Sequence, residues 1–327
     1  MEKLDPVTTD PGEVQTGVID GVGGSGIPDV RCAGAPDAGK AGKFHHLENK
    51  LISALGDPRH RGLDLVTSAD AETQTLEGWI SYTLVDKALE DEDVDVFACR
   101  AGAWQRVGTA RTDDEGHFAL GLSGDDRLPI GMRDLFVSVV GDRTGVGFLA
   151  DVAPAGTPLL VSDVDGTLTS SEDAFLETIV LGLAPDARAG AAAAYTAMAA
   201  RGYQLVYVTS RGNQYTTDTR TWLHDKGFPR GPVRLATSFV TLPGSDTVDY
   251  KTQTITALIQ AGFTVAAGVG NRASDVAAYT NIGVPADHIF IEMPEYAGEV
   301  QPLLDAHQAI GFTSYDQLAA TGLASRP

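Results

Sequence analysis

The feature that most constrains this chain is a change in hydrophobic rhythm near Pro154 and Pro158. Before it, from about Leu76 to Ala150, short runs of alternating apolar and polar residues are separated by turn sequences such as DDEG and GDRTG. Short strands with frequent turns are typical of an antiparallel β-sandwich. After it, apolar runs alternate with helical segments, which predicts a parallel sheet with helices on both faces. The sequence therefore predicts an α/β protein with two folded parts in series.

Length and composition agree with a folded protein of this kind. The 327 residues correspond to about two domains at ~150 residues each. Apolar residues make up 43% and charged residues 21%, which excludes wholesale disorder. The 24 basic and 44 acidic side chains give a net charge of −20. This charge argues against a nucleic-acid-binding face and against strong electrostatic attachment to anionic membranes, although a local basic patch remains an alternative.

Cysteine content and hydropathy indicate the compartment. Cys32 and Cys99 form no CxxC pair that would suggest zinc. A single bridge between them is one alternative, but two free thiols in a reducing compartment are the prediction. The N-terminus shows no apolar signal-peptide core, and no stretch approaches 18 apolar residues. We therefore expect a cytoplasmic protein, with peripheral membrane attachment left open and no protein partner indicated.

The chain divides into four segments. Residues 1–42, rich in Gly, Pro, Asp and Ala, predict a mobile leader. We expect an amphipathic helix and a basic loop in residues 43–62 and an immunoglobulin-like β-sandwich in residues 63–153. The parallel-sheet domain is expected in residues 154–327.

The helix expected from Lys43 to Leu55 carries four apolar side chains at helical spacing: Phe44, Leu47, Leu51 and Leu55. We expect these side chains to pack on the β-sandwich, because amphipathic helices usually face a core. The alternative is that the helix, together with the nearby Arg59 and Arg61, lies in a lipid interface.

The strongest chemical signal is Asp163-Val164-Asp165-Gly166-Thr167, which directly follows the apolar run LLVS. Two carboxylates at one strand end repel each other, so a purely structural role is a poor explanation. They suit a divalent cation, with one carboxylate placed to attack phosphorus. Gly166 permits a tight turn, in which the backbone N–H groups near Gly166 and Thr167 would bind phosphate oxygens.

Three further polar clusters follow, each at the end of a predicted strand or the start of a predicted helix. They are Thr209-Ser210-Arg211, Lys251, and the run from Gly270 to Asp275 that contains Asn271 and Arg272. Each alone has an ordinary explanation as a loop, a surface charge or a helix cap. In parallel sheets, however, ligands bind at the carboxyl ends of the strands, so we expect all four clusters to meet there.

These four clusters resemble motifs I to IV of the haloacid dehalogenase superfamily of phosphotransferases. Their flanks, including DVDGTLTSSE, YVTSRGNQYTTDTRTWL and GVGNRASDVAAY, resemble more narrowly the lipin-type phosphatidate phosphatases and the lipin-like domain of phosphatidylinositol-transfer proteins. The resemblance covers roughly residues 158–291 and implies a Rossmannoid phosphatase domain. In the transfer proteins such domains often lack the full acidic pair and bind lipid, whereas this chain keeps both aspartates.

The resemblance also implies roles for individual residues. Asp163 would be the nucleophile and Asp165 the general acid and base. Mg²⁺ would be held by Asp163, the backbone carbonyl of Asp165, and Asp275, with Asn271 nearby. The remaining roles are phosphoryl binding by Thr209, Ser210 and Lys251, and headgroup contacts by Arg211 and Arg272.

The resemblance favours a Mg²⁺-dependent phosphomonoester hydrolase that acts on phosphatidate or a similar phospholipid. Forty positions separate Thr169 from Thr209, and forty again separate Arg211 from Lys251. These intervals leave no room for a large cap domain, so we expect an open site suited to a lipid headgroup at a membrane surface. Two alternatives stay open: a phosphatase of soluble phosphomonoesters, and a phosphatidate-binding sensor or transfer-associated module with little turnover.

Overall fold

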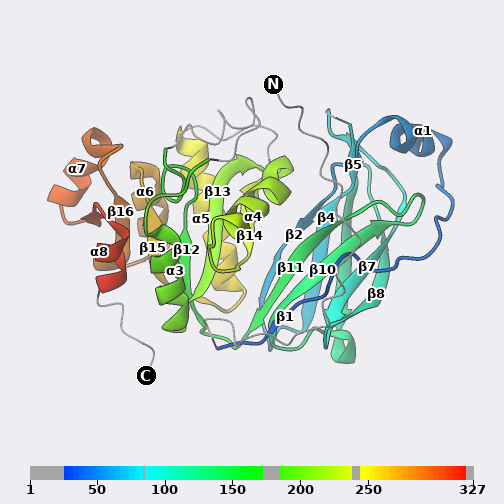
Figure 1. Ribbon diagram of the computed structural model, residues 1–327, viewed down its shortest axis with the longest axis horizontal. Coiled ribbons are helices and arrows are strands. Elements are labelled where there is room, and N and C mark those ends of the chain that lie inside the picture. The colour runs from blue at the N-terminus through cyan, green and yellow to red at the C-terminus, as the bar shows by residue number, and fades with distance from the viewer. Residues whose placement is uncertain (1–25, 84, 172–184, 238–243, 322–327) are drawn as a thin grey trace.

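The computed structural model describes residues 26–83, 85–171, 185–237 and 244–321, and in them the chain forms two parts that lie side by side (Figure 1). The N-terminal part is made of β-sheets, and the C-terminal part is a parallel sheet with helices on both faces. The mixed α/β architecture expected from the change in rhythm at Pro154 and Pro158 is confirmed.

The N-terminal part is a β-sandwich. Its larger sheet has the strand order β3-β11-β10-β7-β8, with bounds Leu65–Ser68, Gly145–Ala153, Gly131–Val139, Asp93–Arg100 and Ala103–Arg111. The second sheet has the order β2-β4-β9, with bounds Arg61–Leu63, Thr73–Trp79 and His117–Ser123. Strands β5 (Ser81–Tyr82) and β6 (Lys87–Ala88) form a short pair, and a 3-10 turn spans Gly124–Asp126. Inward-facing side chains of both sheets, such as Leu76, Phe118, Val96 and Leu135, are fully buried between them.

Two pairings depart from the expected antiparallel pattern. Strand β3 pairs parallel with β11, and β1 (Asp29–Val30) pairs parallel with the first residues of β10. Both added strands lie far from their partners along the chain, so neither pairing could be recognised as a hairpin.

The leader prediction is wrong for residues 26–42. Besides the β1 pairing, a disulfide joins Cys32 to Cys99 of β7, with the two Cα atoms 5.7 Å apart. The N–H of Gly42 donates to the carbonyl of Val140. The segment is therefore fastened along the sandwich, and the prediction of two free thiols is also wrong. Residues 1–25, the rest of the predicted leader, lie outside the described residues.

Helix α1 (Leu47–Leu55) is shorter than expected and faces the opposite way. Leu47, Leu51 and Leu55 are 82%, 62% and 85% exposed, so the expected packing of these leucines on the sandwich is wrong. Phe44 and Ile52 do pack against the sandwich core. The side of the helix that faces the protein carries the buried Asn49.

The C-terminal part is a six-stranded sheet with the order β14-β13-β12-β15-β16-β17, and every pairing in it is parallel. In that order the strands span Val233–Ala236, Gln204–Gly212, Pro158–Ser162, Thr264–Gly270, Ile289–Glu292 and Ile310–Phe312. The helices are α3 (Ala191–Ala200), α4 (Thr216–Asp225), α5 (Gly244–Gln260), α6 (Ala273–Asn281), α7 (Ala297–Asp305) and α8 (Tyr315–Ala320), with 3-10 turns at Asn213–Tyr215 and Ala286–His288. The central position of β12 puts the Asp163 motif at the middle of the sheet edge.

A polar seam joins the two parts. The carboxylate of Asp64, fully buried, accepts hydrogen bonds from the N–H groups of Leu149 and Val233 and pairs with Arg220 of α4. Nearby, the Gln204 amide at the start of β13 donates to the buried carboxyl of Asp151 in β11. Within the described residues no helix is long and apolar enough to cross a bilayer.

Candidate active site

The Asp163 motif forms a tight turn after β12. The N–H of Asp163 donates to the carbonyl of Val269 in β15, which fixes the start of the turn. Gly166 has a φ of 67°, a left-handed conformation that favours glycine. Its N–H donates to the hydroxyl of Thr169, and the hydroxyl of the buried Thr167 donates to Asp163. The Gly166 N–H, one of the backbone groups expected to bind phosphate, therefore donates within the turn, and the Thr167 hydroxyl fastens the turn to Asp163.

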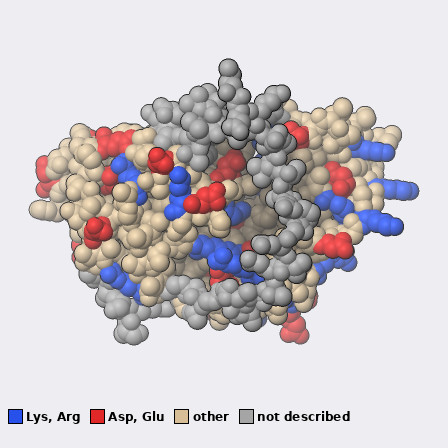
Figure 2. Space-filling view, viewed as in Figure 1, with Lys and Arg blue, Asp and Glu red and all other residues tan. Residues whose placement is uncertain are grey.

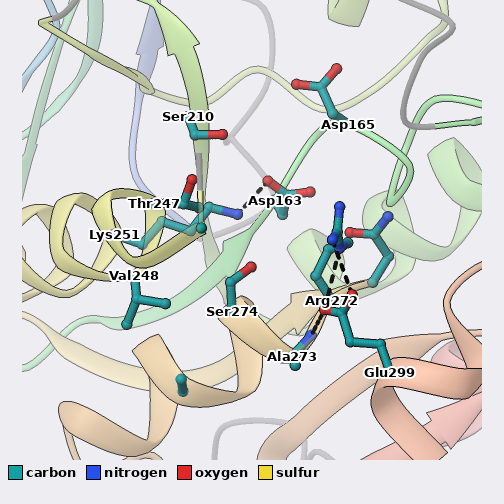
Figure 3. Close-up of a pocket in the computed structure, with 13 residues that line it drawn as sticks. Asp163, Asp165, Ser210, Thr247, Val248, Lys251, Arg272, Ala273, Ser274 and Glu299 are labelled. Carbon is teal, nitrogen blue, oxygen red and sulfur yellow. Dashed lines mark hydrogen bonds and ion pairs between the residues drawn. The ribbon is translucent and has the colours of Figure 1, made fainter. Parts of the chain in front are cut away.

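The centre of the site is a buried arrangement of one lysine between two carboxylates. Lys251 Nζ lies 2.6 Å from Asp163 Oδ1 and 2.6 Å from Asp275 Oδ1. All three side chains are at most 6% exposed. Burial alone would lower the pKa of Lys251, but the charges of Asp163 and Asp275 outweigh it and raise the pKa above its usual value. Figure 3 shows Lys251 reaching from α5 toward Asp163.

The sequence analysis placed Lys251 at the start of a helix, and the structure does not. Helix α5 begins at Gly244, so Lys251 lies in its middle.

Asp275 is held at the start of α6. Its Oδ2 accepts hydrogen bonds from the N–H groups of Asn271 and Arg272, each at 3.0 Å, and this satisfies two donors at the helix N-terminus. Gly270 is required beside it, since a Cβ at Gly270 would lie 2.4 Å from the Asp275 side chain. Asp275 is thus both the cap of α6 and a partner of Lys251.

Asp165 is turned away from Asp163 and is held by Arg211 and Thr209 (Figure 3). Arg211 Nε lies 2.9 and 2.8 Å from the two carboxylate oxygens, and the Thr209 hydroxyl donates to Oδ2 at 2.9 Å. Arg211 is 1% exposed and also donates to Thr219 of α4. Arg211 and the fully buried Thr209 thus contact Asp165 and do not line the pocket, so the roles expected for them at the headgroup and the phosphoryl group stay predictions.

A pocket of about 450 Å³ opens over this centre. The predicted residues that line it are Asp163, Asp165, Ser210, Lys251, Asn271 and Arg272. Ser274, inside the predicted run from Gly270 to Asp275, also lines it, and sequence reasoning missed Thr247 and Glu299. Glu299, on α7, accepts from the Arg272 side chain and from the N–H of Ala273, and Arg272 lies 4.0 Å from the Tyr296 ring centre. Thr247 and Glu299 lie in helices outside the four polar clusters, so the sequence pattern gave no signal for them.

The side-chain oxygens at the pocket supply some, but not all, of the ligands that a hard cation such as Mg²⁺ takes. Among the described residues no three His, Cys, Asp or Glu side chains come together as a metal cage. Asp163 and the buried Asn271 line the pocket, and the buried Asp275 lies beside them, in contact with Lys251 and the Asn271 N–H. Mg²⁺ is commonly bound by one or two carboxylates, with water and substrate phosphate as the other ligands, so these residues fit it.

Comparison with known proteins gives two matched regions. Residues 58–152 match the family model described as the beta-sandwich domain of PITM 1-3, and residues 160–292 match the model described as the LNS2 domain of PITM 1-3. The first region lies within the β-sandwich part, and the second lies within the parallel-sheet part, which continues beyond it through α7, β17 and α8.

Curated relatives point to the same group. Protein retinal degeneration B of Drosophila melanogaster is 30% identical over 71% of this chain and 18% of its own length. Human membrane-associated phosphatidylinositol transfer protein 3 is 26% identical over 71% of this chain and 23% of its own. The chain thus spans about a fifth of the length of these relatives. A solved putative beta-phosphoglucomutase from Thermotoga maritima matches 50% of this chain and 96% of its own at 13% identity, with a TM-score of 0.36, too low to support an argument. The comparisons support a lipin-like LNS2 domain in residues 160–292.

Proposed function

We propose that the pocket binds the phosphomonoester headgroup of phosphatidate, and that the chain acts mainly as a phosphatidate-binding module at a membrane surface. The observation that carries this proposal is the Asp163–Lys251–Asp275 arrangement under the pocket. The matches to lipin-like and phosphatidylinositol-transfer proteins support a phospholipid as the ligand.

The charges around the pocket imply a divalent cation. Asp163 and Asp275 carry two negative charges, and Lys251 compensates one of them. Asp165 is paired with Arg211, and Arg272 with Glu299, so these pairs add no net charge. A phosphomonoester would therefore meet a net charge of minus one, which repels it. Mg²⁺ beside Asp163, Asp275 and Asn271 would reverse the sign and supply electrostatic attraction for the phosphate oxygens.

The position of Asp165 favours binding over rapid turnover. Both of its carboxylate oxygens accept hydrogen bonds from Arg211 or Thr209, and the side chain points away from Asp163. To protonate a leaving group, Asp165 would have to leave a buried guanidinium and turn into the pocket. That rearrangement would slow catalysis.

The second candidate is a Mg²⁺-dependent phosphatase, which the presence of both Asp163 and Asp165 in the pocket lining favours. An Asp163 oxygen would form a bond to phosphorus while the ester P–O bond breaks, and the leaving alkoxide would take a proton from Asp165. Water, deprotonated by Asp165, would then release phosphate and free Asp163. Soluble phosphomonoesters would follow the same route.

The test combines vesicle binding with phosphate release. Phosphatidylcholine vesicles with and without phosphatidate are sedimented with the protein in Mg²⁺ or in EDTA, and free phosphate is measured in the same samples. We expect binding that requires both phosphatidate and Mg²⁺, with little phosphate release. Asp163→Asn is expected to weaken binding, whereas Asp186→Asn, at a carboxylate whose side chain is 89% exposed, serves as the matched control.

The outcomes separate the two candidates. Phosphate release from phosphatidate that falls by about a hundredfold or more in Asp165→Asn would establish the phosphatase. Equal binding to both kinds of vesicle would contradict a phosphatidate pocket. Release from glycerol 3-phosphate alone would leave the chemistry in place and remove the lipid.

A further inference from the structure

Two polar side chains lie inside the apolar interface between the sandwich and the parallel sheet. Asp151 of β11 is fully buried, and Gln204 of β13 is 1% exposed. The residues that share their faces of the strands are apolar and belong to one buried cluster: Leu149 and Ala153 beside Asp151, and Val206 beside Gln204. Because a buried polar group needs a hydrogen-bond partner, each polar atom of this pair has to be accounted for.

One hydrogen bond joins the two side chains, and one acceptor on each of them is left over. The amide Nε2 of Gln204 donates to Asp151 Oδ2 at 2.5 Å. Asp151 Oδ1 and Gln204 Oε1 are both buried, and neither has a hydrogen-bond partner within the part of the chain that the structure describes. A carboxylate oxygen and an amide oxygen are both acceptors, so neither can satisfy the other. A single proton on Asp151 would satisfy both.

The charges around Asp151 do not take the place of that proton. The charged groups that act on it are Arg230 in the loop before β14, Asp64 and Asp29. Arg230 already forms ion pairs with Asp29 and Asp134, and among the described residues no ion pair joins a cation to Asp151. Figure 2 shows charged side chains of both signs at the surface near the middle of the molecule, where the two parts meet in Figure 1. The Asp151 carboxyl, in contrast, has no access to solvent, so its charge would be neither hydrated nor paired.

We propose that Asp151 carries a proton in the folded chain and donates it to Gln204 Oε1, so that a carboxylic acid and an amide join the two parts through two hydrogen bonds. The proton comes from solvent as the interface closes. Burial raises the pKa of Asp151 to about 7, which agrees with a protonated acid up to neutral pH. In an opened interface Asp151 would have an ordinary pKa of about 4. Opening is therefore expected to become easier as the pH rises from about 4 to about 7, and to change no further above it.

Hydrogen exchange of the Val233 N–H in the full chain measures the opening, because this group donates to Asp64 across the interface. Asp151→Asn keeps both hydrogen bonds to Gln204, since its amide donates without a titrating proton. From about pH 5 to about pH 7, after correction for the exchange rate of a free peptide, we expect protection in the wild type to fall about fiftyfold more than in Asp151→Asn. Glu292→Gln is the matched control, because burial also raises the pKa of Glu292 to about 7 but Glu292 lies at the end of β16. This variant is expected to follow the wild type within about threefold.

A direct observation of the proton does not require any variant to fold. In wild-type protein labelled with carbon-13, NMR is expected to show one aspartate side-chain carboxyl that titrates near about pH 7. Its absence from the wild type would overturn the proposal, and so would its persistence in Asp151→Asn. An equal pH dependence of Val233 exchange in the wild type and in Asp151→Asn would do the same, as would the loss of that dependence in Glu292→Gln. Neither measurement uses a ligand, so the result does not depend on the proposed function.

Discussion

Replacing Lys251 with Met tests the central arrangement of the site most directly. The change keeps the length of the side chain but leaves Asp163 and Asp275 facing each other, where Lys251 Nζ now lies 2.6 Å from each. Removing one partner of a buried ion pair costs about 3–5 kcal/mol, because the remaining charge stays uncompensated. We expect urea titration, followed by tryptophan fluorescence, to show a loss of this size in the free energy of unfolding.

A surface control and a double variant make this test specific. Lys226→Met removes a lysine whose partner, Asp186, is largely exposed, and it is expected to cost less than about 0.5 kcal/mol. Adding Asp163→Asn to Lys251→Met removes one of the two facing charges and is expected to recover at least about 1 kcal/mol. A loss below about 1 kcal/mol for Lys251→Met, or no recovery in the double variant, would refute the reasoning.

Two further predictions concern the sandwich and its seam. Reduction of the Cys32–Cys99 disulfide, or Cys32→Ser, is expected to lower the free energy of unfolding by about 4 kcal/mol, because it frees a loop whose ends are 67 residues apart. Urea titration with and without dithiothreitol measures this loss. An unchanged midpoint of unfolding would contradict the prediction. Burial raises the pKa of Asp151 from 3.8 to about 7. Between these two pH values the folded state therefore keeps a proton that the unfolded state has lost. The free energy of unfolding is expected to fall by about 4 kcal/mol as the pH rises from about 4 to about 7. Asp151→Asn is expected to flatten this part of the stability profile, and an equal slope in the variant would rule out Asp151 as its source.

The sequence predicted the elements whose pattern is local. Strands β7 to β11 fall within the alternating region predicted from about Leu76 to Ala150, because alternation and turn residues specify such strands. Helix α7, strand β17 and helix α8 were not predicted, since their apolar runs are short. The disulfide and the β1 pairing depend on contacts between distant segments, which no local pattern records.

The candidate site, like the fold, could be predicted from the sequence only in part. Placing Asp163 and Asp275 near each other required only that strand ends meet at one edge of a parallel sheet. Lys251 reaches both of them from the middle of α5, which the strand ends alone do not determine. The contacts between Asp165 and Arg211 were not predictable, because the choice between a ligand and an internal partner depends on side-chain geometry. For α1, periodicity identified the amphipathic helix but gave the wrong buried side, since the contact of Asn49 with Glu92 determines its orientation.

The seam around Asp64 limits how this chain can be divided. Asp64 belongs to the sandwich side, yet it accepts hydrogen bonds from residues of both parts and pairs with Arg220 on α4. A fragment cut at 160–292 would leave Arg220 and the N–H of Val233 without this carboxylate, and it would lack Tyr315, whose hydroxyl donates to the carbonyl of Thr167 in the Asp163 turn. The regions that similarity marks as separate domains therefore share buried contacts. Asp64 in the sandwich pairs with Arg220 of α4, and Thr219 of the same helix accepts a hydrogen bond from Arg211, the partner of Asp165 in the pocket lining.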